Sequence, residues 1–344
     1  INDLPATKPE DVHPDDLAEI MYTSGTTGDP SGVKLSHRNI LTGLEGLKRL
    51  IPPSREYRVL SILPLSHALE QFVGLLTVFR FGASLYYMPR INPITILRSL
   101  RKYKITHLVV VPQLLKMMWD SIEFRVKQES AEGVFHSALR VAPILPISIR
   151  RVLFRKIHNT IGGELKMFGC AGAPLDKYVA ENWEKTGIVV IEGYGLTETS
   201  AGLTCNTISD RKLGSVGKIL PDIEVKFSKD GEILARGPSV TSGYFKNSAK
   251  TKESFTKAGF FKTGDVGHIA DNGFVYLSGR KKFKIVTPSG EKVYPEDIER
   301  KLNEHPGVKE SCVVGVDKGK GEIVFAAIIL KDTDISGSEA RTHV

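Results

Sequence analysis

The run YTSGTTGDPSG at residues 22–32 crowds hydroxyl side chains and glycines into one segment behind an apolar stretch. Glycine lets backbone N–H groups approach an anion closely, because it has no Cβ. Successive N–H groups in tight turns form anion-binding concavities, and hydroxyl groups add donors that carry no charge. No Gly-Lys-Ser/Thr ends the run, so it differs from the loop of kinases and GTPases. We predict a cradle for a polyphosphate, with a flexible Gly/Ser/Thr linker as the alternative.

A second candidate site is the motif GYGLTET at residues 193–199, which follows the apolar stretch 188–191. The carboxyl end of a strand is where open α/β sheets bind ligands. Glu198 stands where a dinucleotide-binding fingerprint has glycine or alanine, so the motif indicates other chemistry. A tyrosine face can stack on a purine, a threonine can donate to a phosphate, and a glutamate is a hard oxygen ligand for Mg²⁺. A turn with incidental polar residues is the alternative.

Two later segments place charged groups at turns. Asp265, in the motif KTGD at residues 262–265, can accept hydrogen bonds from two ribose hydroxyls or form an ordinary Asx turn. The cationic motif GRKK at residues 279–282, with the turn at 290–295, can pair with phosphates, and a solvated linker is the alternative.

The elements that must position these motifs alternate between strand and helix in the first half of the chain. Ser36 is placed to cap one helix, Asn92-Pro93 to open another, and Gly82 to end a third. Strands separated by helices imply right-handed crossovers and a mostly parallel sheet. The predicted strands are residues 17–21, 58–63, 84–88 and 107–111, and the predicted helices are 36–50, 69–81, 93–103 and 113–127.

The pattern changes in the second half of the chain. Asp230-Gly231 and Asn272-Gly273 are hairpin turn signals between alternating strands, which predicts a β-rich part. Beyond residue 279, the segments 284–286, 296–303, 311–316 and 323–330 indicate a small α+β unit. The predicted fold is therefore α/β, with one large domain at residues 1–279 and a small, truncated α+β C-terminal domain at 280–344. The large domain divides into a parallel-sheet α/β subdomain to about residue 210 and a β-rich (distorted barrel) subdomain over about 211–279.

Composition narrows the class of protein. The 344 residues are 41% hydrophobic and 25% charged, which is ordinary for globular domains, and the length favours two of them. Three distant cysteines without a CxxC pair favour a reducing, cytoplasmic location over a disulfide framework or zinc site. The longest apolar run, residues 323–330, is too short to span a bilayer, although peripheral membrane contact stays open. The net charge of +8 indicates a solvated basic surface, and its short clusters do not indicate a nucleic-acid partner.

The order and spacing of these motifs resemble those of the AMP-forming acyl-CoA synthetases, within the superfamily of adenylate-forming ligases. Among these enzymes the chain is most similar to the long-chain fatty acid ligases, and the resemblance extends over nearly its whole length. The motifs that carry the resemblance are residues 22–37, 63–67, 169–175, 194–199, 231–244, 263–265 and 279–299.

The resemblance implies an enzyme that binds ATP, Mg²⁺ and a fatty acid, forms acyl-AMP and pyrophosphate, and passes the acyl group to CoA. Such transfer needs positioning and charge neutralisation more than covalent help from the protein. By this resemblance the catalytic residues are His67 near the carboxylate, Thr197 at a phosphate, Glu198 at Mg²⁺, and Arg280. The nucleotide-binding residues are Thr23, Ser24, Gly25, Thr26, Thr27 and Gly28 at the β- and γ-phosphates, Gly172, Ala173, Pro174 and Tyr194 at the adenine, Asp265 at the ribose, and Lys282 at the hinge.

Several positions depart from the family pattern. Ser31 stands where the family's loop has lysine, and Lys34 is a candidate substitute, so we expect Ser31→Lys to raise activity or lower the KM for ATP. Phe283 occupies a position where an acidic residue is common. The family's N-terminal subdomain and its late catalytic lysine have no counterpart in these residues, so we expect this fragment to bind nucleotide yet turn over poorly.

The substrate class and the rival functions stay open at this point. The segment 64–74 around His67 is mainly apolar and lacks aspartate, which favours an apolar acyl chain over an amino acid, although Phe72 and Val73 are alternatively core residues. The rivals are an acyl-AMP ligase that loads a carrier protein, a degenerate nucleotide- or acyl-binding protein, and a nucleic-acid module, for which stacking aromatics are not evident.

Overall fold

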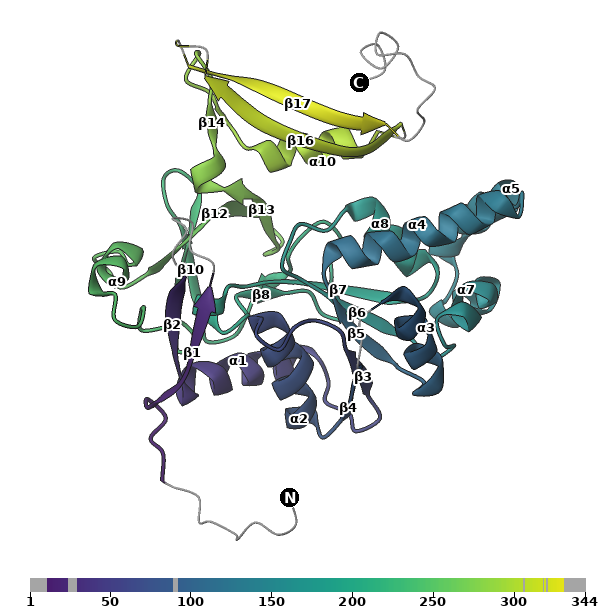
Figure 1. The fold of residues 1–344 in the computed structure, drawn as a ribbon, viewed down its shortest axis with the longest axis horizontal. Coiled ribbons are helices and arrows are strands. Elements are labelled where there is room, and N and C mark those ends of the chain that lie inside the picture. The colour runs from purple at the N-terminus through teal and green to yellow at the C-terminus, as the bar shows by residue number, and fades with distance from the viewer. Residues whose placement is uncertain are drawn as a thin grey trace.

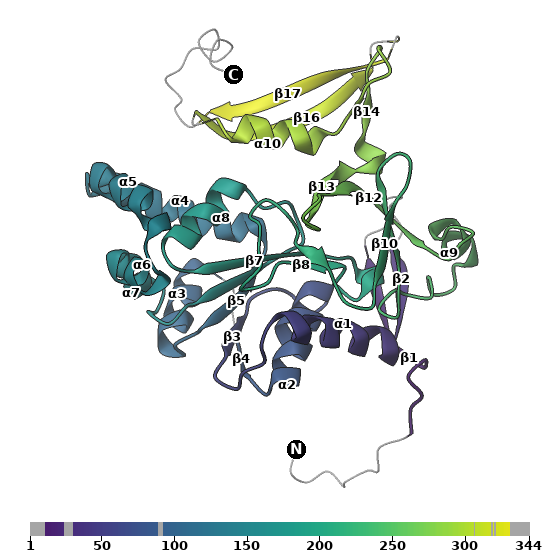
Figure 2. The same cartoon turned by 180° about the vertical axis from the view of Figure 1, so that it is seen from behind.

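The computed structural model describes residues 11–23, 30–88, 92–305, 307–317, 319 and 321–330 (Figures 1 and 2). A seven-stranded sheet, in the order β4-β3-β5-β6-β7-β8-β9, forms the centre of the first half of the chain. Its first five strands run parallel, as predicted, and β8 and β9 are antiparallel additions. The strands are β3 (Arg58–Ser61), β4 (Ser84–Tyr87), β5 (His107–Val110), β6 (Met167–Cys170), β7 (Val189–Tyr194), β8 (Thr204–Cys205) and β9 (Lys218–Ile219).

Helices cover both faces of this sheet, as parallel strands require. On one face, apolar side chains of several helices pack around Trp119 and Trp183. On the other face, Leu47 of α1 and Phe81 of α2 pack against Met167 and Ile191 of the sheet. The helices on the first face are α3 (Pro93–Lys102), α4 (Pro112–Gln128), α5 (Glu132–Val141), α6 (Ile147–Leu153), α7 (Arg155–Thr160) and α8 (Lys177–Lys185), with the 3₁₀ turn η2 (Ala142–Ile144); those on the second are α1 (His37–Leu50) and α2 (Thr77–Phe81).

The predicted helix boundaries follow from local chemistry. Ser36 and Asn92 each form a capping box at the start of α1 and α3, so both predicted N-caps are confirmed. Gly82 ends α2 with a φ of 67°, a left-handed conformation that favours glycine.

The predicted helix at residues 69–81 is correct in position and wrong in type over its first half. Residues Leu69–Leu76 form a π-helix, η1, which continues into α2. Glu70 is fully buried in it, and a Cβ at Gly74 would lie 2.6 Å from the Glu70 Oε1 atom. The glycine therefore makes room for a carboxylate folded back against the helix. Periodicity does not reveal this feature, because π-helices arise from one locally widened turn and are frequent at functional sites.

The β-rich part contains a four-stranded antiparallel sheet in the order β10-β11-β12-β13. The predicted turn at Asp230-Gly231 joins β10 to β11, and the one at Asn272-Gly273 joins β12 to β13. A separate hairpin, β1 with β2, lies beside this sheet, and an isolated bridge pairs Val33 of β2 with Tyr244. The elements are β1 (Leu17–Thr23), β2 (Ser31–Ser36), β10 (Glu224–Phe227), β11 (Glu232–Arg236), α9 (Ser248–Ser254), β12 (Phe261–Ile269) and β13 (Val275–Arg280).

A small α+β unit follows β13 and forms a separate layer in both views (Figures 1 and 2). Its long hairpin, β16 with β17, packs on one helix, α10. Cys170, Cys205 and Cys312 are all free thiols. Among the described residues, no helix combines the length and apolar character needed to cross a bilayer. The elements of this unit are η4 (Lys281–Phe283), β14 (Ile285–Val286), β15 (Lys292–Val293), α10 (Pro295–Asn303), β16 (Val308–Asp317) and β17 (Glu322–Leu330).

Candidate functional site

Glu198 belongs to a network that joins three segments far apart in the sequence. It lies in the 3₁₀ turn η3 (Thr197–Thr199), directly after β7. Its Oε1 atom accepts a hydrogen bond from the Tyr244 hydroxyl at 2.8 Å, and its carbonyl accepts one from the Thr241 amide at 2.8 Å. The Thr241 hydroxyl in turn donates to the Lys34 carbonyl in β2. The β1–β2 hairpin, the Glu198 turn and the segment 241–244 therefore meet at one place.

The backbone after Glu198 is held in a strained conformation. Ser200 and Ala201 have φ values of 51° and 61°, in the left-handed region that costs a non-glycine residue about 1–3 kcal/mol. The Ser200 hydroxyl donates to the Ser239 carbonyl at 3.0 Å, which helps to hold this conformation. Gly195 packs against the same turn, because a Cβ there would lie 2.4 Å from the carbonyl carbon of Ala201. The glycine in the motif is therefore a packing requirement of the turn that carries Glu198.

Asp265 lies in a second polar cluster, on β12. Its Oδ2 atom accepts a hydrogen bond from the Tyr194 hydroxyl at 2.6 Å, and its Oδ1 atom lies 2.9 Å from the Nε atom of Arg280. The strand register places Asp265 directly opposite Arg280 across the β12–β13 pair. Tyr194 ends β7, four residues before Glu198. The three residues assigned from the sequence to the adenine, the ribose and a catalytic role are thus in direct contact.

Burial governs the charge state of this cluster. Burial raises the pKa of Asp265, while the Arg280 guanidinium and the Tyr194 hydroxyl act against that rise. Burial beside the Asp265 carboxylate also raises the pKa of Tyr194 well above its usual value, so Tyr194 stays a neutral donor. A buried carboxylate held by a guanidinium and a hydroxyl has a fixed orientation, which suits a residue that receives two vicinal hydroxyls.

Three of the four residues predicted at the adenine form an exposed turn after β6, while the fourth, Tyr194, is buried at the end of β7. This turn, residues 172–174, begins with Gly172 at a φ of 93°, which favours glycine. The next residue, Leu175, is buried, and its backbone N–H donates to the carboxylate of Glu192. Burial raises the pKa of Glu192 to about 8, and its Oε2 atom has no hydrogen-bond partner within the described structure. Glu192 thus anchors the turn from β7, a role the sequence motifs did not reveal.

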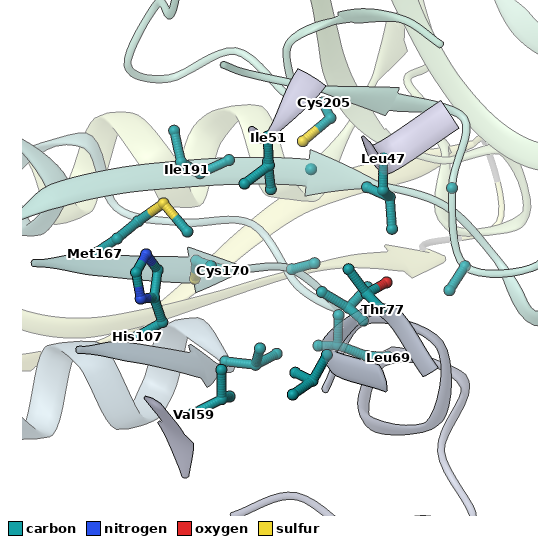
Figure 3. Close-up of a pocket in the computed structure, with 18 of the residues that line it drawn as sticks. Leu47, Ile51, Val59, Leu69, Thr77, His107, Met167, Cys170, Ile191 and Cys205 are labelled. Carbon is teal, nitrogen blue, oxygen red and sulfur yellow. The ribbon is translucent and has the colours of Figure 1, made fainter. Parts of the chain in front are cut away.

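An apolar cavity of about 100 Å³ lies beside this polar edge, between the central sheet and the helices η1, α1 and α2 (Figure 3). Alternate residues of the strands face it, since successive strand side chains point to opposite faces. At the carboxyl ends of the strands it is lined by Ala171 and Gly193, and at their amino ends by His107 and Met167. The four steps along the chain from Met167 to Ala171 correspond to roughly 13 Å along the strand. Gly169, between them, leaves the space open, because a Cβ there would have only one neighbouring atom, at 4.0 Å.

Two packed rings close the amino end of the cavity. The ring centres of Tyr57 and His107 are 4.1 Å apart, and the Tyr57 hydroxyl donates to the Pro52 carbonyl at 2.7 Å. The Nδ1 atom of His107 lies 2.7 Å from the hydroxyl oxygen of Thr106. Burial lowers the pKa of His107 to about 4, so the imidazole is neutral at physiological pH. The floor of the cavity is therefore uncharged and suits an apolar occupant.

The remaining sequence-predicted residues lie around these features. Thr23 ends β1, and its hydroxyl donates to the Ser31 carbonyl at 3.4 Å. His67 is exposed and lies two residues before Leu69, which lines the cavity. Lys282 is exposed, with its ammonium 4.5 Å from the centre of the Phe283 ring. The other predicted phosphate contacts, Ser24, Gly25, Thr26, Thr27 and Gly28, lie outside the described residues.

The surroundings of Glu198 fit the predicted Mg²⁺ ion. The Tyr244 hydroxyl donates to Oε1, and within the described residues no hydrogen bond or ion pair to Oε2 is formed. In the same part of the chain, no group of three or more His, Cys, Asp or Glu residues is arranged to hold a metal. Such a group is not needed, because Mg²⁺ is usually bound by one or two carboxylates together with substrate phosphates and water. One free carboxylate oxygen thus matches an ion that arrives with a nucleotide.

The fold and these loops define the class of adenylate-forming enzymes. The family described as "AMP-binding enzyme" matches residues 2–245, and the "AMP-binding enzyme C-terminal domain" matches residues 297–344. The chain belongs to the AMP-binding enzyme family.

Its relatives include ligases of long-chain fatty acids. The long-chain-fatty-acid–CoA ligase FadD15 of Mycobacterium bovis is 33% identical over 318 residues, which cover 87% of this chain and 52% of that protein. The long-chain-fatty-acid–CoA ligase of Escherichia coli O157:H7 is 33% identical over 348 residues, 96% of this chain and 55% of the relative. A long-chain-fatty-acid–[acyl-carrier-protein] ligase of Arabidopsis thaliana, AEE15, is 29% identical over 394 residues. The match covers 94% of this chain and 53% of that protein. The chain spans about half the length of these relatives.

Solved structures of related enzymes share the fold. ATP-bound MatB from Rhodopseudomonas palustris has a TM-score of 0.78 and 29% identity, over 97% of this chain and 62% of that one. The o-succinylbenzoate CoA synthetase of Bacillus subtilis, in complex with its acyl-adenylate intermediate, has a TM-score of 0.75 and 26% identity. The match covers 96% of this chain and 63% of that one. The predicted fold class is confirmed: a parallel-sheet α/β part, antiparallel β sheets and a small C-terminal domain.

Proposed function

We propose that this protein activates a fatty acid with ATP and transfers the acyl group to CoA. A carboxylate oxygen of the fatty acid attacks the α-phosphorus of ATP, the bond from that phosphorus to the bridging oxygen breaks, and pyrophosphate leaves. The CoA sulfur then attacks the acyl carbonyl, AMP leaves, and the thiol proton passes to solvent or a base. The observation that carries the proposal is the apolar cavity whose lining includes Gly193, the residue directly before Tyr194 of the Tyr194–Asp265–Arg280 cluster.

The chain's own residues have separable tasks in this proposal. Asp265 receives the ribose hydroxyls while Tyr194 and Arg280 fix its orientation. Glu198 holds Mg²⁺, which neutralises phosphate charge when it is bound, and Thr197 donates to a phosphate. Gly172, Ala173 and Pro174 line the adenine, and the residues from Thr23 to Gly28 contact the β- and γ-phosphates. His67, which is exposed and precedes the cavity-lining residue Leu69 by two positions, is assigned to the substrate carboxylate.

Fatty-acid-dependent exchange of labelled pyrophosphate into ATP tests the activation step directly. We expect exchange that requires both Mg²⁺ and an apolar carboxylic acid, and that does not require CoA. If ATP binds measurably but no acid supports exchange, the protein binds nucleotide without activating a carboxylate, and the proposed function is wrong. Formation of acyl-CoA from purified acyl-AMP then tests the second step on its own.

Gly169→Leu should restrict the acyl chain. Gly169 lies on the cavity side of β6, and its ideal Cβ position has only the Val109 Cγ2 atom within reach, at 4.0 Å. A leucine side chain would extend into the empty space without displacing backbone. We expect kcat/KM for dodecanoate to fall roughly tenfold relative to butyrate, since lost methylene contacts are each worth about 1–3 kcal/mol. Exchange assays with both acids measure the ratio.

The matched control is Gly169→Ala, which adds one methyl group to the same strand position. It should change the dodecanoate-to-butyrate ratio much less than leucine does. The KM for ATP should be unchanged in both variants, because the nucleotide lies at the strand ends rather than in the cavity. An unchanged chain-length profile in the leucine variant would show that the acyl chain binds elsewhere.

A carrier-protein ligase is the second candidate, because one relative, AEE15, is named as a ligase of acyl-carrier protein. The two candidates share the adenylation step and differ only in the thiol that accepts the acyl group. Offering the protein CoA and a phosphopantetheinylated carrier protein in competition separates them. We favour CoA, because the FadD15 and Escherichia coli relatives are named as CoA ligases.

The domain division proposed from the sequence also bears on function. We place the large domain at residues 1–279 and the small domain at 280–344, with Lys282 at the hinge between adenylation and thioester formation. Arg280, which ends β13, is tied to both parts: its Nε atom faces Asp265, and its backbone N–H donates to Glu296 of α10 at 3.3 Å. A cytoplasmic location, which the three unpaired cysteines favour, and contact with a membrane surface, which an apolar substrate favours, are further proposals.

A further inference from the structure

Ser31 deprives the phosphate-binding segment of the cation that the family's loop carries at this position. It is the first residue of β2 and pairs with Thr23, the last residue of β1. The two residues therefore mark the base of the glycine-rich segment. A hydroxyl there offers a hydrogen bond but no charge, whereas a polyphosphate carries several negative charges. Another cation near Ser31 is needed if the site binds a triphosphate tightly.

Lys34 does not answer this need. Side chains alternate between the two faces of a strand, so residues three positions apart point to opposite faces. Lys34 is three positions from Ser31 in the same strand, β2. Val33 and Leu35, which share a face with Ser31, are fully buried, and Lys34 lies on the opposite face. The lysine suggested by sequence distance therefore faces away from the side on which Ser31 lies.

Lys250 reaches the same spot from a different element. Its Nζ atom lies 2.8 Å from the Oγ atom of Ser31, although 219 residues separate them in the sequence. The residue belongs to the short helix α9, whose start is fixed by a hydrogen bond from the Lys250 amide to the Asn247 side chain at 2.9 Å. A lysine ammonium has three donors, and Ser31 uses one of them. Among the described residues, no carboxylate pairs with Lys250.

The position of Lys250 also ties it to the proposed metal ligand. Its ammonium lies 4.2 Å from the centre of the Tyr244 ring, and the hydroxyl of that ring donates to Glu198 at 2.8 Å. One contiguous set of contacts thus runs from Ser31 through Lys250 and Tyr244 to Glu198. An ammonium and a magnesium-binding carboxylate on the same cluster are the groups that a metal-bound triphosphate would meet together.

We propose that Lys250 supplies the positive charge for the β- and γ-phosphates that Ser31 does not supply, with the Ser31 hydroxyl orienting the ammonium. The inference rests on the proposed function, because it assumes that ATP is the nucleotide. It assigns a phosphate-binding role to a residue outside the motifs of the first half of the chain. It also explains how a serine is tolerated in the loop: the charge comes from α9 instead.

The test compares binding of ATP with binding of AMP, which lacks the β- and γ-phosphates. Isothermal titration with each nucleotide in the presence of Mg²⁺ should show that Lys250→Ala weakens ATP binding roughly tenfold, the size of one charge-assisted hydrogen bond. AMP binding should be unchanged. The matched control is Lys252→Ala, which removes the same charge from an exposed position of the same helix and should leave both affinities as in the wild type.

Restoring the charge from the loop completes the test. Ser31→Lys in the Lys250→Ala background should recover most of the lost ATP affinity. Ser31→Lys alone should add little, which replaces the gain expected from the sequence, because Lys250 already places a cation at this position. Equal weakening of ATP and AMP by Lys250→Ala, or no effect on either, would overturn the inference while leaving the proposed function intact. A wild-type protein that binds neither nucleotide would overturn both.

Discussion

Replacing Glu198 with glutamine should reduce fatty-acid-dependent pyrophosphate exchange by about a hundredfold or more, a loss typical of removing one group that stabilises transition-state charge. The amide keeps the shape of the side chain and can still accept the hydrogen bond that the Tyr244 hydroxyl donates to Oε1. It loses the negative charge that holds Mg²⁺. Exchange measured across a Mg²⁺ titration should show that a higher Mg²⁺ concentration is required and that the maximum rate stays low.

Two further variants separate the charge of Glu198 from its position. Tyr244→Phe removes the hydrogen bond and leaves the carboxylate, so we expect a loss of only about tenfold or less. Glu224→Gln removes a charge from an exposed pair with Arg236 and should have no effect on exchange. If Glu198→Gln keeps more than about a third of the wild-type rate, the carboxylate is not the metal ligand and the assignment from the motif is wrong.

The predictable parts of this fold are those whose signals are local. Ser36 and Asn92 begin α1 and α3 because their side chains cap backbone N–H groups within three residues. The same holds for Gly82 at the end of α2 and for the Asp-Gly and Asn-Gly turns of the β-rich sheet. Alternation of strands and helices then leaves few topologies open for the central sheet. The π-helix escaped prediction because apolar periodicity does not distinguish a locally widened turn from an α-helix.

The candidate site shows the same division between local and distant causes. Motifs of consecutive residues singled out Glu198, Asp265 and Arg280 as candidates, and the structure places Asp265 and Arg280 opposite each other on β12 and β13. Lys250 and Glu192 act through residues that are distant in sequence or on a neighbouring strand, so no local pattern marks them. The cavity depends on which face of each strand is left open, and a glycine such as Gly169 becomes informative only when the opposing helices are in place.

Glu192→Gln should change how stability depends on pH, because a titrating group is replaced by one that does not titrate. Burial raises the pKa of Glu192 from its ordinary 4.5 to about 8 in the folded protein. Between these values the folded state holds a proton that the unfolded state has released, so the free energy of unfolding falls as pH rises from 4.5 to 8 and levels off above it. The loss associated with this group is on the order of 5 kcal/mol.

The curves of unfolding free energy against pH should therefore cross for the glutamine variant and the wild type. At pH 5 both side chains are neutral, and the variant should be no more stable than the wild type. The NH₂ group of the glutamine would stand at the position of Oε2, which has no hydrogen-bond partner within the described structure, so its two donors would be buried without acceptors. At pH 9 the wild type buries a carboxylate, and the variant should be the more stable protein. Urea unfolding at pH 5, 7 and 9 measures the difference, in which the titration of all other groups cancels.

The same variants also test the turn at residues 172–174, which the proposed function places at the adenine. The oxygen of the glutamine amide can still accept the hydrogen bond from the Leu175 N–H, so AMP affinity should survive the substitution. Glu192→Leu offers no acceptor to that N–H, and it should weaken AMP binding as well as stability. Two parallel stability curves for wild type and Glu192→Gln would mean that Glu192 titrates normally in the folded protein. Its carboxylate would then be solvated, and the anchor between β7 and the turn at 172–174 would not be the buried contact described here.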